Sequence, residues 1–163
     1  MLSSAAQLLG TARWGSAAND CGPAGAKSVA AMVAVTASLT VTDMRFNQLD
    51  RKSATMLATI AKEKEISLCG ITQGQTEADF TPGKNSWNTM KPADAILLTA
   101  DIFVRASLTS LDLSGNVPYD MREQGPAFAS AIAEGLKANA SLTSLNLAHN
   151  NLGDGETGYV EAN

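Results

Sequence analysis

Two nearly identical stretches of ten residues constrain the fold of this chain more than any other feature. Residues 107–116 read SLTSLDLSGN, and residues 141–150 read SLTSLNLAHN. In both, leucines follow the spacing L-x-x-L-x-L, and an asparagine comes three residues after the last leucine. Leu111 and Leu113, two positions apart, share one face of a short strand. Asn116 then turns the chain, and its side-chain amide can bond the backbone of the turn.

A helical pattern follows the first of these stretches. Phe128, Ile132 and Leu136 recur at every fourth position of GPAFASAIAEGLKANA, which places them on one stripe of a helix. The unit is therefore strand, turn, helix and return. One such unit cannot bury its own leucines, so the pattern predicts several copies stacked on one another.

These residues resemble leucine-rich repeats of the ribonuclease-inhibitor-like class. The clearest matches are Leu108, Leu111, Leu113, Asn116 and Leu142, Leu145, Leu147, Asn150, followed by Leu152. Residues 39–49 match less closely, and residues 14–25 match weakly. In the third repeat, ISLCGI and TEADF both have the character of a strand. The resemblance implies an α/β solenoid with a short parallel sheet on its concave side and helices on its convex side.

We expect one domain over residues 1–163, with about five repeats that start near residues 11, 39, 75, 108 and 142. Residues 1–10 form a capping helix on this interpretation, with Ser4 as its N-cap and Gly10 as its stop. An organellar presequence is the alternative, because the first acidic residue is Asp20.

Composition and charge exclude several classes of partner. Aromatic residues make up only 5% of the 163 residues, so small side chains must do much of the packing and backbones should approach closely. The net charge of −4 disfavours nucleic acid and anionic membrane surfaces. No apolar run approaches the roughly 18 residues of a membrane span, so we expect no membrane insertion.

The residues that carry catalysis or bind cofactors are sparse. The stretch GPAGAKS lacks the glycine that precedes lysine in a phosphate-binding loop, and His149 is the only histidine. We therefore expect no cofactor, no metal and no enzymatic activity. Two cysteines do not make a disulfide framework. Cys21 and Cys69 are predicted to be buried thiols in a reducing intracellular compartment, the cytoplasm or an organelle such as the mitochondrion or plastid.

Polar residues alternate with the inward positions of the predicted strands. These concave-face candidates are Asp43, Asp79, Asp112 and Asn146, with Glu77 beside them and Arg45 as partial relief of their charge. Strands stack about 4.8 Å apart, so we expect a column of like charges. One hypothesis is a docking strip for a basic protein surface. The alternative is that small polar side chains simply cover an open face.

Two insertions lengthen the third and fourth repeats. They contain TPGKNSWNT and VPYDMREQ, which come just after the strands. Insertions in such repeats lie on one edge, and exposed aromatic side chains anchor interfaces. Trp87, Tyr119 and Met121 are therefore predicted to bind a partner. Alternatively, the two loops pack on each other as a lid.

The last repeat supplies a strand and then ends in DGETGYVEAN. Leu145, Leu147 and Leu152 would lack a covering helix, which predicts a poorly capped C-terminal edge. Either the chain is a piece of a longer protein, or another molecule covers these leucines.

Together these features predict a non-catalytic module for protein–protein interaction, as the resemblance implies. We expect a scaffold or structural subunit that docks onto a larger assembly. The alternative is a regulatory binder that activates or inhibits a partner enzyme, such as a small GTPase or a ribonuclease.

Overall fold

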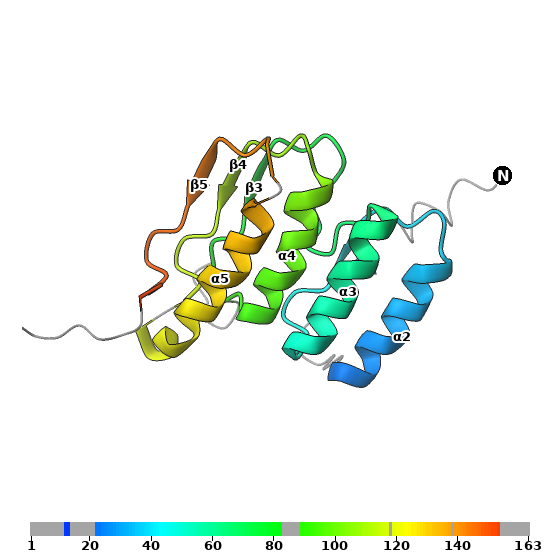
Figure 1. The fold of residues 1–163 in the computed structure, drawn as a ribbon, viewed down its shortest axis with the longest axis horizontal. Coiled ribbons are helices and arrows are strands. Elements are labelled where there is room, and N and C mark those ends of the chain that lie inside the picture. Colours follow the sequence, from blue (N-terminus) through cyan, green and yellow to red (C-terminus); the bar gives the residue numbers. More distant parts are fainter. Residues whose placement is uncertain (1–11, 14–21, 83–88, 118, 138, 154–163) are drawn as a thin grey trace, which may run out of the picture.

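The computed structural model describes residues 12–13, 22–82, 89–117, 119–137 and 139–153. These residues form four α-helices that lie side by side in chain order, with short strands along one side of the helical layer (Figure 1). The helices are α2 (Gly22–Val35), α3 (Arg51–Lys64), α4 (Pro92–Val104) and α5 (Gly125–Leu136), and a 3₁₀ helix, η1 (Tyr119–Gln124), precedes α5. The strands are β1 (Ala12–Arg13), β2 (Thr42–Asp43), β3 (Glu77–Asp79), β4 (Ser110–Asp112) and β5 (Ser144–Asn146).

The described strands pair in parallel, as predicted, but they form two sheets. β1 pairs with β2, and a second sheet has the order β3-β4-β5. In the second sheet Ala78, Leu111 and Leu145 are in register. The expectation of one continuous sheet was therefore wrong for these residues, because β2 and β3 are not paired with each other.

Residues 66–71 occupy the position beside β2. Val41 and Ser67 form a parallel bridge, and the N–H of Thr42 donates to the carbonyl of Ser67 at 2.9 Å. The N–H of Gly70 donates back to the carbonyl of Thr42 at 3.0 Å. The third repeat thus uses both of its strand-like stretches. One lies beside β2, and the other becomes β3 beside β4.

A buried carboxylate on α4 binds residues 66–71, here called the inserted segment, through hydrogen bonds. Asp101 is fully buried, and its oxygens accept hydrogen bonds from the Ser67 hydroxyl at 2.6 Å and from the Leu68 N–H at 2.6 Å. The N–H of Cys69 also donates to Asp101, at 3.0 Å. Three donors that no strand satisfies are therefore bound by one side chain, which offsets the cost of burying them.

Arg105, the C-cap residue of α4, binds carbonyl groups of the same segment. Its guanidinium is buried and donates to the carbonyls of Ile71 at 3.0 Å, Glu65 at 3.3 Å and Thr40 at 2.7 Å. The positive charge also lowers the pKa of Asp101, against the larger effect of burial. A buried anion within α4 and a buried cation at its C-cap thus bind backbone groups of this segment.

Asparagine side chains connect the turns that follow β3, β4 and β5. The Asn116 amide donates to the carbonyls of Leu113 and Phe80, both at 2.9 Å, and accepts from the Met90 N–H at 2.9 Å. Asn150 accepts from the Asn116 N–H at 2.6 Å. The predicted role of the turn asparagine is confirmed, and it also extends to the neighbouring repeat.

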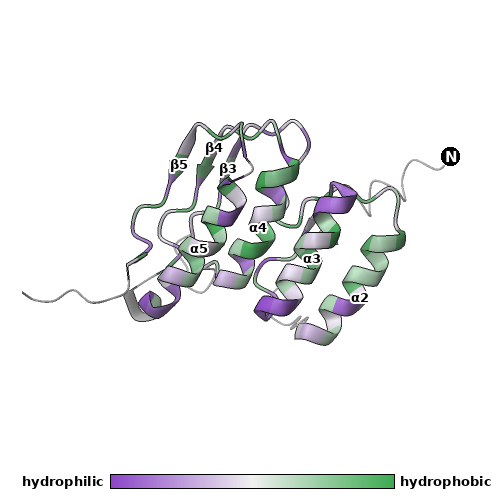
Figure 2. Ribbon diagram, in the orientation of Figure 1, coloured by the Kyte–Doolittle hydropathy of each residue, from purple (hydrophilic) through white to green (hydrophobic). Residues whose placement is uncertain are grey.

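Small side chains let the helices approach closely, as the composition predicts. A Cβ at Gly135 on α5 would lie only 3.1 Å from Thr99 on α4. Alanines such as Ala26, Ala54 and Ala95 are fully buried. α2 is apolar along most of its length, whereas α3 is polar at both ends (Figure 2). Among the helices that the structure describes, none combines the length and apolar character that crossing a membrane would require.

We predict that Asp101 makes stability fall as the pH rises through the acid range. Burial raises the pKa of Asp101 to about 6 in the folded protein, whereas an unfolded chain has an aspartate pKa near 3.9. Between these values the folded state binds more protons, so the free energy of unfolding decreases with pH. The expected decrease in the free energy of unfolding across this pH range is up to about 3 kcal/mol. Urea unfolding of wild type and Asp101→Asn at pH 4, 5, 6 and 7 measures it, because the variant lacks this titration.

Asp50→Asn is the control. Hydrogen bonds from Ser53 lower the pKa of this exposed N-cap carboxylate of α3. Asp50 therefore contributes to the free energy of unfolding at every pH above the aspartate pKa of the unfolded chain. This contribution is lost only as the pH falls below that value. The difference from wild type should therefore stay flat from pH 5 to 7. If the Asp101→Asn difference is equally flat, the assignment to Asp101 is wrong.

Candidate functional site

The face of β3-β4-β5 that points away from the helices, here called the open face, carries a row of polar side chains. Asp79, Asp112 and Asn146 are in register across the three strands. Their neighbours Ala78 and Leu111 point into the core and are buried. The structure therefore brings three of the predicted concave-face residues together.

Asp43 does not belong to this row. It lies in β2, opposite Arg13 of β1, and it bridges Cys69 in the inserted segment. The prediction of a continuous column from Asp43 to Asp79 was wrong, because residues 66–71 separate the two strands.

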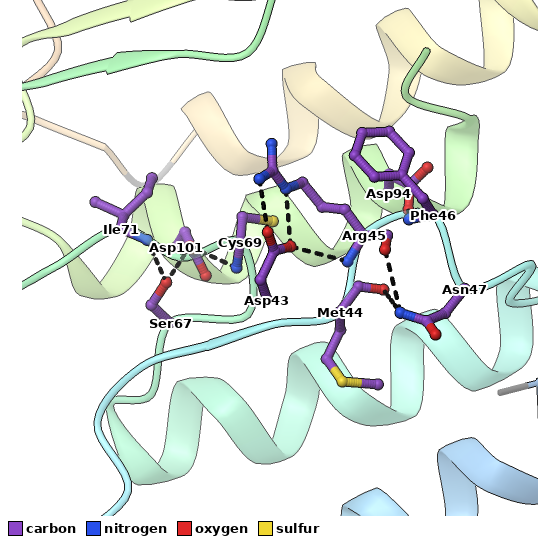
Figure 3. A network of polar contacts seen from close by, with 10 residues as sticks. All are labelled: Asp43, Met44, Arg45, Phe46, Asn47, Ser67, Cys69, Ile71, Asp94 and Asp101. Atoms are coloured by element: carbon purple, nitrogen blue, oxygen red, sulfur yellow. Dashed lines mark hydrogen bonds and ion pairs between the residues drawn. The ribbon is translucent and has the colours of Figure 1, made fainter. Parts of the chain in front are cut away.

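Among the predicted concave-face residues, Arg45 pairs with Asp43. Its Nε and Nη2 donate to the two carboxylate oxygens at 2.9 and 2.7 Å, and both side chains are largely buried (Figure 3). In this bidentate ion pair the two charges neutralise each other. In the part of the chain that the structure describes, Glu77, Asp79 and Asp112 form no ion pair.

Each of the acidic or amide residues at the strand ends also has a local structural role. Its side-chain oxygen accepts the backbone N–H two residues later, which is an Asx turn. The same bond recurs in four strands, at 3.2 Å for Asp43 and Arg45, 2.8 Å for Asp79 and Thr81, 2.8 Å for Asp112 and Ser114, and 3.0 Å for Asn146 and Ala148. Turn formation alone explains an Asp or Asn at this position, but it does not require a negative charge.

Asp112 has the most extensive hydrogen bonding in the row. The Ser114 hydroxyl donates to it at 2.7 Å, and the Asn146 amide donates at 2.9 Å across the strand pair. The Ser114 hydroxyl and N–H, and then Asn146, lower the pKa of Asp112. The carboxylate is therefore held ionised and fixed in orientation.

Positive charge lies elsewhere on the described surface. The described lysines sit on the helices or at their ends: Lys27, Lys52, Lys62, Lys64, Lys91 and Lys137. None of them pairs with a carboxylate of the open face, and the one described lysine ion pair joins Lys137 to Glu134. The helical side thus carries both signs of charge, including Glu63 and Glu134, whereas no described lysine lies on the open face.

The predicted insert-edge residues have different outcomes. Trp87 lies outside the described residues. Tyr119 begins the 3₁₀ helix η1, so this insertion is helical rather than an open loop. Met121 is only partly exposed and packs against the core. Met121 thus has both a buried and an exposed part, and its role in binding a partner stays a prediction.

The predicted C-terminal edge is partly covered. Leu145, Leu147 and Leu152 are half-buried and pack against the core, whereas Leu111 and Leu113 of the previous strand are fully buried. The edge is thus less well covered than the preceding strand, and its predicted contact with another molecule stays a prediction. The tail at 154–163 lies outside the described residues.

A cluster around Arg45 escaped the sequence analysis. The guanidinium carbon lies 4.5 Å from the centre of the Phe80 ring and 5.4 Å from the centre of the Phe46 ring. Buried Asp94, on α4, accepts the Phe46 N–H at 2.9 Å. The available signals were an aromatic residue in the turn after β2 and carboxylates in an otherwise apolar helix.

The described residues contain no group of three or more His, Cys, Asp or Glu side chains placed to hold a metal ion. Cys69 is buried, as predicted, and burial raises the pKa of its thiol well above the ordinary value. The thiol therefore stays neutral and is a poor nucleophile.

Comparison with family models identifies a leucine-rich repeat at residues 138–155. This match spans β5 and the turn at Asn150. The chain therefore contains a leucine-rich repeat, and such repeats are typical of protein–protein interaction. No curated protein matches the sequence.

We predict that Asp112→Asn and Asp112→Ala separate the turn-forming role from the charge. Asparagine keeps an oxygen that can accept the Ser114 N–H, as Asn146 does for Ala148. Alanine loses this bond, so it should lower the free energy of unfolding by about 1 kcal/mol relative to asparagine. Urea unfolding of both variants measures the difference. Equal stability of the two variants would contradict a structural role for the Asx turn.

Proposed function

We propose that this chain is a non-catalytic docking module whose open face binds a positively charged surface or segment of another protein. The observation that carries the proposal is the row of Asp79 and Asp112, with Glu77 beside it, on the paired strands β3 and β4. Glu77 and Asp79 are exposed, Asp112 is partly exposed, and none of the three forms an ion pair among the described residues. Charge complementarity speeds encounter and selects partners. Three turn hydrogen bonds of one kind fix the ends of β3, β4 and β5, so the partner meets a preformed surface.

The leucine-rich repeat at residues 138–155 supports a protein partner over other ligands. We further propose that the described strands and helices are units of an α/β solenoid of about five repeats, of the ribonuclease-inhibitor-like class. The open face is then its concave side. Successive helices in contact and registered strands support this arrangement.

A scaffold or structural subunit of an intracellular assembly is the role that we favour. The half-buried leucines of β5 support it, because their equivalents in β4 are completely buried. A partner that covers β5 would bury more apolar surface, which stabilises the complex by roughly 25 cal/mol per Å² buried.

The test removes charge from the open face and leaves the fold intact. Asp79→Asn with Asp112→Asn keeps both Asx-turn acceptors but removes two negative charges. Glu63→Gln with Glu134→Gln, on the helical side, removes two charges in exposed positions and serves as the control. We expect affinity capture from native extract, with mass spectrometry, to lose specific partners for the first variant only.

Affinity for a captured partner should then be measured at ionic strengths of about 0.05 and 0.3 M. Screening weakens exposed charge pairs, so wild type and the helical-side control should lose affinity with salt, and the open-face variant should lose less. Unchanged affinity of the open-face variant at both ionic strengths would refute the proposal.

A further inference from the structure

The turn after β2 holds an aromatic residue in an unfavourable backbone conformation. Phe46 has φ of +63°, in the left-handed region, and its side chain is 40% exposed. Gly115 and His149 occupy the same place after β4 and β5, with φ of +74° and +58°. Glycine adopts this conformation at no steric cost, whereas a bulky residue is strained there.

The surrounding contacts hold this conformation in place. The Phe46 N–H donates to the buried carboxylate of Asp94 at 2.9 Å, and Asp94 also accepts from the Lys91 N–H at 2.8 Å at the start of α4 (Figure 3). The conformation thus depends on the backbone of Phe46 and not on its ring. The ring contributes little to the core, so packing does not account for an aromatic residue at this place.

The ring belongs to a surface that includes two other side chains, here called the aromatic cluster: Phe46, Arg45 and Phe80. Arg45 lies over both rings, and the bidentate pair with Asp43 fixes its guanidinium. Phe80 packs against the core on one side and is partly exposed on the other. The exposed parts of the two rings are therefore held in a fixed geometry, which lowers the entropic cost of binding.

The cluster adjoins the acidic row of the open face. Phe80 directly follows Asp79, which is exposed and forms no ion pair among the described residues. The charge of Arg45 is already matched by Asp43. An occupant that contacts the cluster and continues onto the row thus meets apolar rings first and unpaired carboxylates next.

We propose that the aromatic cluster is the anchor of the docking surface, and that it takes a large apolar side chain of a protein segment whose neighbouring Lys or Arg residues contact Asp79 and Asp112. This inference rests on the proposed function and gives the partner its chemistry. Exposed aromatic residues and Arg are the residues that most often dominate interface energies. Strain stored at one residue is also typical of binding sites.

Three synthetic peptides test the proposal by fluorescence anisotropy with the full chain. The first is GKKWLKKG, the second replaces Trp-Leu with Ser-Ser, and the third replaces all four lysines with glutamate. Wild type should bind the first at least about tenfold more tightly than the second, and should not bind the third, since apolar contact and charge both contribute.

The variant Phe46→Asn removes the ring but tolerates the left-handed conformation, as Asn151 does at φ of +41°. It should bind the first and second peptides equally and shift the Tm by no more than a few degrees. Phe46→Tyr retains a ring and should keep the preference. Asp79→Asn with Asp112→Asn should weaken binding of both basic peptides and leave the preference between them.

The outcomes distinguish the two proposals. If both lysine peptides bind wild type and depend on the aspartates, but Phe46→Asn retains the preference for Trp-Leu, the anchor is refuted and the acidic docking surface stands. If wild type binds none of the peptides, the anchor and the acidic surface are both refuted. A large fall in Tm for Phe46→Asn with retained preference would assign the ring to stability instead.

Discussion

The side-chain amides of the turn asparagines are the interaction on which the rest of this structure depends. Strands of two or three residues satisfy few backbone groups, so the turns that follow them would leave buried carbonyls and N–H groups without partners. Asn116 binds carbonyls of its own turn and of the preceding one, and Asn150 binds the N–H groups of Asn116 and Val117. Each turn therefore has its complete set of hydrogen bonds only when the next one is stacked on it. This mutual dependence positions the strand ends and, through them, the row of Asp79 and Asp112.

Local signals allowed much of this arrangement to be predicted. The leucine spacing and the turn asparagine identified β4, β5 and the turn after each, because strand, turn and helix of one repeat are adjacent in sequence. The break in the sheet could not be predicted in this way. It depends on Asp101 of α4 and on Arg105 at the C-cap of α4, which lie more than thirty residues away from the segment they hold. A helix that reads as PADAILLTADIFV gives no indication of which backbone groups its carboxylates will meet.

The candidate site, like the fold, was predictable where local sequence patterns determine it and not where tertiary packing does. Alternation along a strand placed Asp79 and Asp112 on the open face, and their register follows from the matching of the repeats. Asp43 was misplaced, since alternation says nothing about whether two strands are neighbours. Met121 was assigned to a surface because it lies in an insertion, but its side chain is only partly exposed and also packs against the core. Burial of a single residue depends on tertiary packing, which a local pattern does not contain.

The residue at the strained turn position connects the architecture with specificity. A left-handed conformation costs a residue other than glycine about 1–2 kcal/mol, and the turn requires it after β2, β4 and β5 alike. Gly115 avoids this cost and His149 carries a polar side chain, but neither adds an aromatic surface. The Asp94 carboxylate accepts the Phe46 N–H and so fixes the backbone of this turn. The Phe46 side chain is therefore not needed to form the turn. The same framework that repeats from strand to strand can then vary at this one position without disturbing the asparagine bonds beneath it. In this arrangement the asparagines that maintain stacking are distinct from the residue at the strained position, and this separation is what allows the partner-binding role that we propose for Phe46.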